Sequence, residues 1–152
     1  PQLTDVGQLV CDVAAMQRDL RVTTEIDEQL ERIPADPDRL RQVLMNLAAN
    51  AREATREQAE PRLAVTLAAG EREAVITVED NGPGVPADQR ERIFEPYRTA
   101  KKGGLGLGLA LVKGIVLAHG GNITVGESRW GGAAFVITLP RPAAAARETD
   151  HA

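Results

Sequence analysis

Two asparagines stand four residues apart in a stretch with helical apolar spacing, so Asn46 and Asn50 are neighbours on one helix face. Asparagine is a poor helix former, and a half-buried amide needs hydrogen-bond partners. The pair is therefore either structural, with both amides bonded inside the protein, or a set of ligands for a metal ion or a phosphate. An amide oxygen suits Mg2+ when phosphates and waters complete the octahedron.

Segment 80–84 reads Asp-Asn-Gly-Pro-Gly and follows a run of β-branched residues that predicts a strand. One interpretation is an ordinary turn. The other is a site for a flat ligand, because Gly82 and Gly84 carry no Cβ and let the backbone come close to it. Asp80, at the strand end, can accept a hydrogen bond from an amino group of such a ligand.

Segment 103–108 reads Gly-Gly-Leu-Gly-Leu-Gly and leads directly into an apolar helical pattern. Glycine loses the most conformational freedom on folding, so this segment is a poor scaffold element. Free N–H groups and partial positive charge at a helix N-terminus attract phosphate. With Lys101 and Lys102 just upstream, the pattern predicts either an anion site or a flexible hinge beside a solvated charge pair.

The elements that must position these clusters follow from apolar spacing and from start and stop signals. Asp36 and Pro37 predict a helix start, because aspartate accepts free backbone N–H groups and proline fits the first turn. We expect helices over 5–20, 37–57, 88–93 and 107–118, and strands over 22–26, 62–69, 74–79, 122–127 and 133–139. This order favours a two-layer α/β sandwich with a mixed, mostly antiparallel sheet.

Length and composition limit the class of protein. The chain has 152 residues, 43% of them hydrophobic, and a formal net charge of −4, which argues against a general nucleic-acid binder. One cysteine excludes an internal disulfide, and no apolar run reaches the roughly 18 residues of a membrane span. We expect one soluble domain over 1–140 and a disordered tail over 141–152, where leucine, isoleucine, valine and phenylalanine are absent.

Several kinds of catalytic site are excluded by the residues that the chain lacks. Its histidines are His119 and His151, so neither a serine–histidine–aspartate triad nor a cysteine–histidine metal cluster is expected. His119 is expected to cap the helix that ends before Gly120, and His151 lies in the tail. The GxxxxGK[ST] phosphate loop and the strand–GxGxxG–helix fingerprint are also absent.

Taken together, the clusters resemble a known family. An asparagine helix, then DNGPG, then Phe-Glu-Pro at 94–96, and then GLGLGL before a helix follow the motif order of the ATP-binding catalytic domain of sensor histidine kinases. That superfamily includes gyrase, the heat-shock chaperone ATPases and the mismatch-repair ATPases. Four motifs in order at the family's spacing are specific, and the resemblance covers about residues 3–140. It implies a Bergerat-type ATP-binding fold.

Carried over by position, the resemblance implies roles for individual residues. Asn50 in NLAANA matches the family's magnesium ligand, and Asn46 matches its partner one turn earlier, near the phosphates. Asp80 matches the carboxylate that accepts from the adenine amino group. Gly82 and Gly84 match the glycines that let the chain pass the purine.

The resemblance extends to the mobile lid of the family. Phe94 matches the F-box phenylalanine at the base of an ATP lid that would span 97–103, and Lys101 resembles a basic lid residue that reaches the phosphates. The second glycine box matches Gly104, Leu105, Gly106, Leu107 and Gly108. Three positions depart from the pattern: Glu53 replaces a common basic residue, Leu105 replaces a small polar one, and Tyr97 stands at the second F-box aromatic.

Asn46 distinguishes between activities within the superfamily. The gyrase-like branch has a glutamate one turn before the metal-binding asparagine, as general base for water, whereas an amide has no useful basicity. The resemblance therefore implies a protein-histidine kinase domain that binds Mg-ATP. It would donate the γ-phosphoryl group to a histidine on a separate dimerisation and phosphoacceptor hairpin.

In the family, the acceptor histidine lies on a hairpin just upstream of this domain, and a downstream response regulator then takes the phosphoryl group. We therefore expect an excised, monomeric, cytoplasmic domain that does not autophosphorylate alone, with no nucleic-acid or direct membrane contact; its parent can be membrane-anchored. Two alternatives remain open. One is a serine kinase similar to anti-sigma factors, and the other is a degenerate module that binds nucleotide or a partner for regulation.

Overall fold

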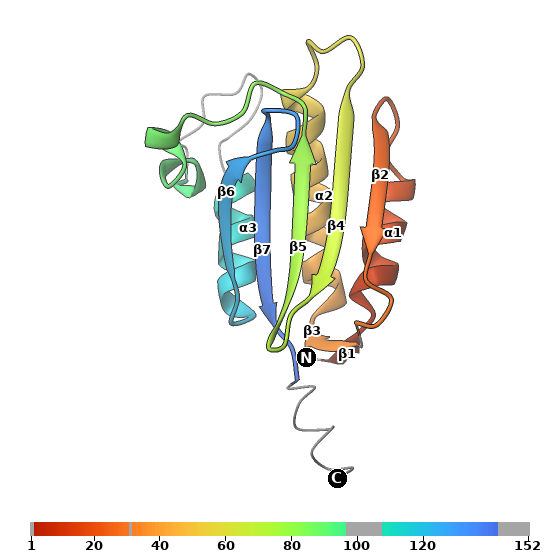
Figure 1. Cartoon of the computed structure of the whole chain (residues 1–152). Coiled ribbons are helices and arrows are strands. Elements are labelled where there is room, and N and C mark those ends of the chain that lie inside the picture. The colour runs from red at the N-terminus through yellow and green to blue at the C-terminus, as the bar shows by residue number, and fades with distance from the viewer. Residues whose placement is uncertain (1, 31, 97–107, 143–152) are drawn as a thin grey trace.

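The computed structural model describes residues 2–30, 32–96 and 108–142, in which a sheet and a layer of helices pack face to face (Figure 1). The elements are β1 (Gln2–Thr4), α1 (Val6–Ala15), β2 (Arg21–Ile26), β3 (Ile33–Ala35), α2 (Pro37–Ala54), β4 (Arg62–Ala69), β5 (Glu73–Asp80), the 3₁₀ turns η1 (Ala87–Gln89) and η2 (Arg92–Phe94), α3 (Gly108–Ala118), β6 (Asn122–Glu127) and β7 (Ala133–Pro140).

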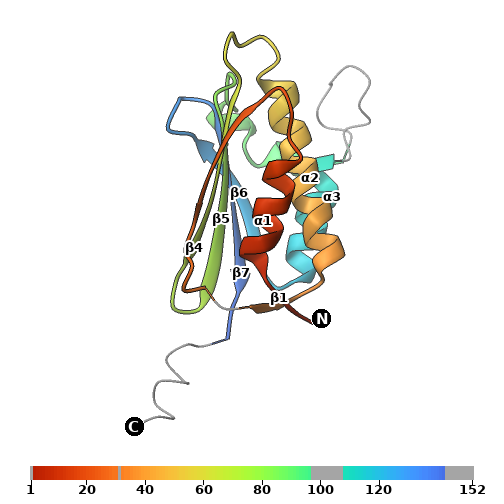
Figure 2. The ribbon, with the colours of Figure 1, turned by 90° about the vertical axis from the view of Figure 1, so that its right-hand side faces the viewer.

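The main sheet has five strands in the order β2-β4-β5-β7-β6. β2 runs parallel to β4, and the other neighbouring pairs are antiparallel. Helices α1, α2 and α3 all lie on the same face of this sheet (Figure 2). The predicted two-layer sandwich with a mixed, mostly antiparallel sheet is confirmed.

The alternation of side chains along β5 decides which of its residues reach the core. Ile76, Val78 and Asp80 are buried, and the residues between them are half-exposed. Because successive strand residues point to opposite faces, Asp80 lies on the same face as the two apolar residues before it. This face also receives Phe135 of β7 and is the one that the helices cover. The strand period therefore carries a carboxylate to the helix-covered side of the sheet.

α2 starts at the predicted signal. Asp36 accepts hydrogen bonds from two backbone N–H groups of the first turn, at 3.0 and 3.3 Å, and Pro37 is the first helical residue. The helix ends at Ala54 rather than at residue 57, because Thr55 leaves the helical conformation, with φ −100° and ψ 7°, and its hydroxyl caps the carbonyl of Ala51. The buried stripe consists of Leu40, Val43, Leu44, Leu47, Ala48 and Ala51.

α1 is shorter than predicted. It ends at Ala15 rather than at residue 20, because β2 begins at Arg21, whose N–H binds the carbonyl of Pro61. The chain turns between the two elements at Asp19, whose φ of 65° is a value that aspartate adopts more readily than most residues. β2 begins at Arg21 because it pairs in parallel with β4, where Arg21 lies opposite Arg62, the first residue of β4.

The remaining elements agree with the sequence except for short ones. The strands predicted over 22–26, 62–69, 74–79, 122–127 and 133–139 are found to within one residue at either end. The helix predicted over 88–93 is wrong, because the structure has two separate 3₁₀ turns there. Strands β1 and β3, which pair with each other, were not predicted, since three residues are too few to show alternation.

The predicted boundary between domain and tail falls at the end of β7. Arg141 donates its N–H to the carbonyl of Arg72 at 3.0 Å, and its guanidinium donates to the carbonyl of Gly70 at 2.6 Å. Residues 143–152 of the predicted tail lie outside the described residues. Residue 107 of the helix predicted over 107–118 also lies outside them, and α3 is described from Gly108.

His119 joins the end of α3 to the start of α2. Its Nε2 accepts a hydrogen bond from the N–H of Asp36 at 3.0 Å, which assigns the ring proton to Nδ1. Nδ1 then donates to the carbonyl of Ile115 in the last turn of α3, at 2.9 Å. The predicted capping role is confirmed, and the bond to α2 is an additional tie between the two helices.

We expect His119→Ala to lower the unfolding free energy by about 1 kcal/mol, because two partly exposed hydrogen bonds are lost, and the melting temperature by roughly 2–4 °C. Thermal unfolding followed by circular dichroism measures the shift. Leu117→Ala in the last turn of α3, at a residue that is 52% exposed, is the control and should change the midpoint little. Equal midpoints for His119→Ala and the wild type would contradict the tie.

Candidate functional site

Asp80 is a buried carboxylate at the point where β5 leaves the sheet. The residue is 2% exposed and lies on the helix-covered face. Its Oδ1 accepts hydrogen bonds from the N–H of Gly82 at 2.9 Å and from the N–H of Ala133 at 3.3 Å. An ionised carboxylate accepts several hydrogen bonds and donates none, so the position suits a ligand that presents an N–H donor.

Two glycines let the loop after Asp80 pack between a helix and a turn. A Cβ on Gly82 would lie 2.6 Å from the carbonyl oxygen of Ala54, the last residue of α2. Gly84 has a φ of +83°, and a Cβ there would lie 3.1 Å from the carbonyl oxygen of Gly131. Both glycines are required by contacts within the protein. Their role in letting the chain pass a purine stays a prediction.

Asn81 fastens the same loop to the start of β4. Its Oδ1 accepts from the N–H of Arg62, and its Nδ2 donates to the carbonyl of Glu60, both at 2.9 Å. These two bonds use the amide for holding the loop in place. Of the first two residues of the loop motif, Asn81 is therefore structural, and Asp80 is the one that faces the helices.

Asn46 and Asn50 lie half-buried on successive turns of α2, as their spacing predicts. Asn50 stands one turn before Ala54, the residue against which Gly82 packs. The end of α2 therefore meets the end of β5, where Asp80 lies (Figure 1). The fold brings the first two predicted clusters to the same end of the molecule, although Asn50 and Asp80 are 30 residues apart in the sequence.

Glu53 stands on the next turn of α2, where the resemblance predicts a basic residue. Its carboxylate accepts from the guanidinium of Arg56 at 3.1 Å, and the side chain of Arg56 is 66% exposed. An exposed pair of this kind adds little stability. It does place the positive charge of Arg56 beside Glu53, and this charge partly offsets the negative charge of Glu53 at the end of α2.

Phe94 anchors the end of η2 in the core. Its ring meets the ring of Phe135 edge to face, with centroids 6.2 Å apart and planes at 84°. The ammonium group of Lys113 in α3 lies 5.4 Å from the centroid of the Phe94 ring. The residue predicted at the base of the lid is thus held by β7 on one side and α3 on the other.

Five predicted site residues lie outside the described residues: Lys101, Gly104, Leu105, Gly106 and Leu107. The lid predicted over 97–103 lies outside them as well. Gly108, the last residue of the predicted glycine box, is described as the first residue of α3. It is exposed, and a Cβ built on it would have no neighbour within 4 Å. The packing of the described protein therefore does not require a glycine there.

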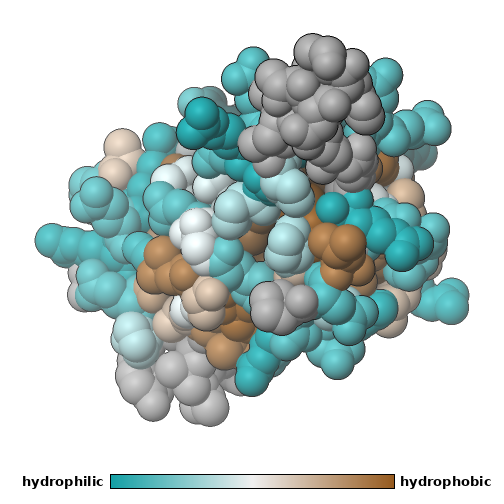
Figure 3. All heavy atoms as spheres, turned by 90° about the horizontal axis from the view of Figure 1, so that it is seen from below, coloured by the Kyte–Doolittle hydropathy of each residue, from teal (hydrophilic) through white to brown (hydrophobic). Residues whose placement is uncertain are grey.

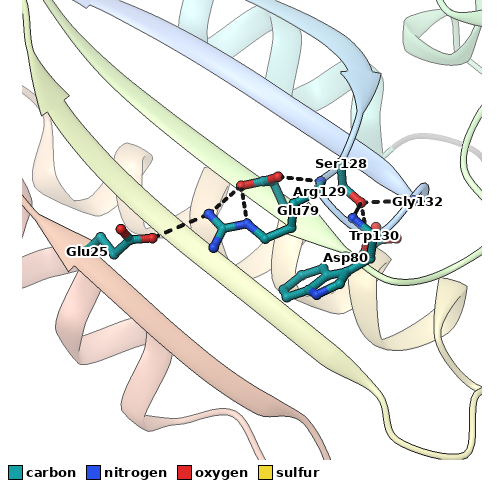
Figure 4. Close-up of polar contacts among 7 residues, drawn as sticks. All are labelled: Glu25, Glu79, Asp80, Ser128, Arg129, Trp130 and Gly132. Carbon is teal, nitrogen blue, oxygen red and sulfur yellow. Dashed lines mark hydrogen bonds and ion pairs between the residues drawn. The ribbon is translucent and has the colours of Figure 1, made fainter.

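The turn between β6 and β7 contacts Asp80 and is a part of the site that sequence reasoning missed. The hydroxyl of Ser128 donates to the carbonyl of Asp80 at 2.7 Å and accepts from the N–H of Gly132 at 2.9 Å and of Trp130 at 3.2 Å (Figure 4). The Trp-Gly-Gly sequence predicts a turn but not its partner. One available signal is that Ser128 is the only serine in the chain.

Arg129 binds the residue before Asp80. Its backbone N–H and its guanidinium donate to the two carboxylate oxygens of Glu79, each at 2.9 Å, and the guanidinium reaches Glu25 of β2 at 3.3 Å (Figure 4). The hydrogen bond and charge of Glu79, helped by those of Glu25, raise the pKa of Arg129 above its ordinary value. The guanidinium therefore stays charged and ties the turn to the outer face of the sheet.

A hollow of about 920 Å³ lies at the opposite end of the molecule. Pro34, Asp36, His119 and Arg141 line it together with neighbouring residues. Seen from below, polar side chains cover most of this end and small apolar patches interrupt them (Figure 3). None of the predicted site residues that the structure describes lines this hollow, so its size does not make it the candidate site.

A family model described as histidine kinase-, DNA gyrase B- and HSP90-like ATPase matches residues 35–143. Among curated relatives, the sensor histidine kinase ZraS of Salmonella typhi is 45% identical over 129 residues. The match covers 83% of this chain and 27% of ZraS, so the chain spans about a quarter of that relative.

Solved structures of similar fold include two histidine kinases. Full-length ShkA in complex with AMPPNP has a TM-score of 0.81 at 33% identity, over 94% of this chain and 31% of ShkA. A nucleotide-free catalytic domain of the histidine kinase ThkA also has a TM-score of 0.81, at 29% identity, over 93% of this chain and 99% of that domain.

We expect Gly82→Ala to lower the unfolding free energy by about 1–3 kcal/mol, because the added methyl group collides with the end of α2. Gly126→Ala in β6 is the matched control, since a Cβ there has no neighbour within 4 Å, and it should stay within about 0.5 kcal/mol of the wild type. Urea unfolding measures both. Equal effects of the two substitutions would contradict the close packing of the loop.

Proposed function

Because the chain belongs to the histidine kinase-, DNA gyrase B- and HSP90-like ATPases, we propose that it binds Mg-ATP. In this proposal it donates the γ-phosphoryl group to a histidine on a separate phosphoacceptor domain of a two-component sensor kinase. One observation carries the proposal: the buried carboxylate of Asp80 is fixed by two N–H groups beside the helix that carries Asn46 and Asn50. The similarity to the sensor kinase ZraS and to ShkA, solved with AMPPNP, supports it.

Asp80 is the residue that would recognise the base. The 6-amino group of adenine donates hydrogen bonds, and a bond from it to a carboxylate is charge-assisted and therefore strong. Burial increases this effect, because water does not compete well for a carboxylate that is 2% exposed. Because two N–H groups already hold Oδ1 of Asp80, the carboxylate needs little rearrangement when a ligand binds.

The α2 residues fit a magnesium ion that is held mainly by its nucleotide. Within residues 2–30, 32–96 and 108–142, no cluster of three histidine, cysteine, aspartate or glutamate side chains could bind a metal on its own. Mg2+ keeps several waters and binds through few protein oxygens plus substrate phosphates, so one amide oxygen from Asn50 is a sufficient protein contribution. When bound, the ion would neutralise phosphate charge, and Asn46 would lie beside the phosphates.

The phosphate groups would meet the segment before α3. Phosphates bind at helix N-termini, where free N–H groups and the helix dipole favour negative charge. Gly108 begins α3 with an exposed backbone and no side chain. Lys101 would add a positive charge, and Gly104, Leu105, Gly106 and Leu107 would add backbone N–H groups.

Phosphoryl transfer to another group is favoured over hydrolysis by the residues of α2. Activation of water needs a general base within reach, and the amides of Asn46 and Asn50 cannot serve as one. Glu53, the carboxylate on the following turn, is bonded to Arg56. Transfer to a positioned nucleophile needs mainly orientation and charge neutralisation, which this arrangement can supply.

The partners of such a domain are a phosphoacceptor hairpin, from the same parent protein, and a downstream response regulator. Since the chain spans about a quarter of ZraS, these partners and the activity of the whole protein belong to the proposal. We place the domain in the cytoplasm, as a monomer, without nucleic-acid or direct membrane contact. None of the helices in the described part of the chain is long and apolar enough to cross a bilayer.

Calorimetric titration with ADP and with AMPPNP, with and without Mg2+, tests nucleotide binding. We expect Mg2+-dependent binding that Asp80→Asn weakens about ten- to hundredfold, because a charge-assisted hydrogen bond is lost. Asn81→Ala is a less informative change, since it loosens the loop itself. Wild-type binding that is equal with Asp80→Asn would contradict the assigned base site, and absence of binding would favour a degenerate regulatory module.

Transfer is tested by fusing the chain behind a phosphoacceptor hairpin of a sensor histidine kinase and supplying γ-labelled ATP. We expect an acid-labile, alkali-stable label on histidine, reduced by about 100-fold or more in Asn50→Ala, because charge neutralisation at the phosphates supplies most of the catalysis. Asn122→Ala at an exposed position of β6 is the matched control and should transfer normally. An acid-stable label on serine would instead support the serine-kinase alternative.

A further inference from the structure

The β6–β7 turn binds two consecutive residues at the end of β5. Ser128 donates its hydroxyl to the carbonyl of Asp80, and Arg129 binds the carboxylate of Glu79 through its backbone and its guanidinium (Figure 4). The first contact is to a backbone carbonyl, and the second is to a side chain on the outer face of the sheet. One turn thus binds the backbone of Asp80 and the side chain of the residue before it.

The same turn also reaches the side chain of Asp80. At the start of β7, Ala133 donates its N–H to Oδ1 at 3.3 Å, while Gly82 donates to the same oxygen from the following loop. The carbonyl of Asp80 is therefore bonded to the turn by Ser128, and its carboxylate is bonded to Ala133, the residue with which β7 begins after the turn. Any shift of that turn would move both the backbone and the side chain of Asp80.

Gly132 makes this approach sterically possible. A Cβ at that position would collide with the carbonyl oxygen of Asp80 and would lie 2.7 Å from its Oδ1 and 2.9 Å from the nitrogen of Gly82. The neighbouring Gly131 has a φ of +83°, which few other residues adopt. Ser128 is 7% exposed and accepts the N–H of Gly132, so its hydroxyl also fixes the glycine against the strand.

We infer that the β6–β7 turn sets the base selectivity of the nucleotide site: Ser128 and Gly132 are positioning residues that hold the Asp80 carboxylate in the orientation that accepts a 6-amino purine. This inference rests on the proposed function, because it needs a purine nucleotide at Asp80. Selectivity depends on orientation, since a 6-oxo purine presents an acceptor to the same carboxylate and is repelled only if the carboxylate cannot turn away.

The test compares the affinities for ADP and for IDP, whose base differs from adenine by a 6-oxo group. In the wild type we expect ADP to bind about ten- to hundredfold more tightly. In Ser128→Ala the ADP affinity should fall about three- to tenfold while the IDP affinity changes less than about twofold, so the ratio of the two falls. Ser128→Thr keeps the hydroxyl and should restore the wild-type ratio.

Thr4→Val is the matched control for loss of a buried hydroxyl. Thr4 is 6% exposed and donates to the carbonyl of Ala35 at 3.0 Å, in the small β1–β3 sheet. Its loss should lower stability and leave the ADP-to-IDP ratio unchanged, because a general loss of stability affects both ligands equally. Circular dichroism confirms that each variant is folded before titration.

The outcomes separate this inference from the proposed function. If the wild type binds ADP selectively and Ser128→Ala leaves both affinities unchanged, the positioning role is overturned and the proposed function stands. If Ser128→Ala weakens ADP and IDP equally, so that their ratio again stays the same, the turn acts on stability alone and the inference is also overturned. If the wild type binds no nucleotide, both the proposed function and the inference fall.

Discussion

At the end of the molecule that holds Asp80, the structure depends on backbone segments that approach one another too closely for a side chain to fit between them. Gly82 packs against the carbonyl of Ala54, and Gly132 packs against the carbonyl of Asp80. These contacts join the end of α2, the end of β5 and the β6–β7 turn around one buried carboxylate. A larger residue at either glycine would separate the segments, and the carboxylate would lose its N–H donors. The geometry of the candidate site is therefore a consequence of backbone packing as much as of its polar side chains.

The remainder of the fold keeps that junction rigid. α2 spans the sheet from the Asp36 cap, which His119 ties to α3, up to the turn that meets Gly82. Phe94 is clamped between Phe135 and α3, so the segment that follows it leaves from a fixed point in the core. In the described part of the candidate site, the surroundings of Asp80 are therefore held in place before any ligand binds.

Sequence reasoning worked where chemistry follows from local order. The spacing of Asn46 and Asn50, the Asp36 start signal and the alternation before Asp80 each depend on a few adjacent residues, and the family inferred from the motif order is confirmed. The role of Ser128 could not be predicted, because its partner is 48 residues away and depends on the strand order β5-β7-β6. The end of α1 was misplaced for a related reason, since the pairing of β2 with β4 decided it. The roles of Lys101 and of 104–107 stay predictions.

We propose that Asp80, held by the β6–β7 turn, receives the base of a nucleotide whose metal lies at Asn50. A crystal structure of the chain with AMPPNP and Mg2+ tests it most directly. We expect the purine 6-amino group within hydrogen-bond distance, roughly 2.7–3.2 Å, of the Asp80 carboxylate. We also expect the metal to bind the amide oxygen of Asn50, with Ser128 still bonded to the carbonyl of Asp80. A nucleotide bound in the hollow near His119, or a base that turns its amino group away from Asp80, would contradict it.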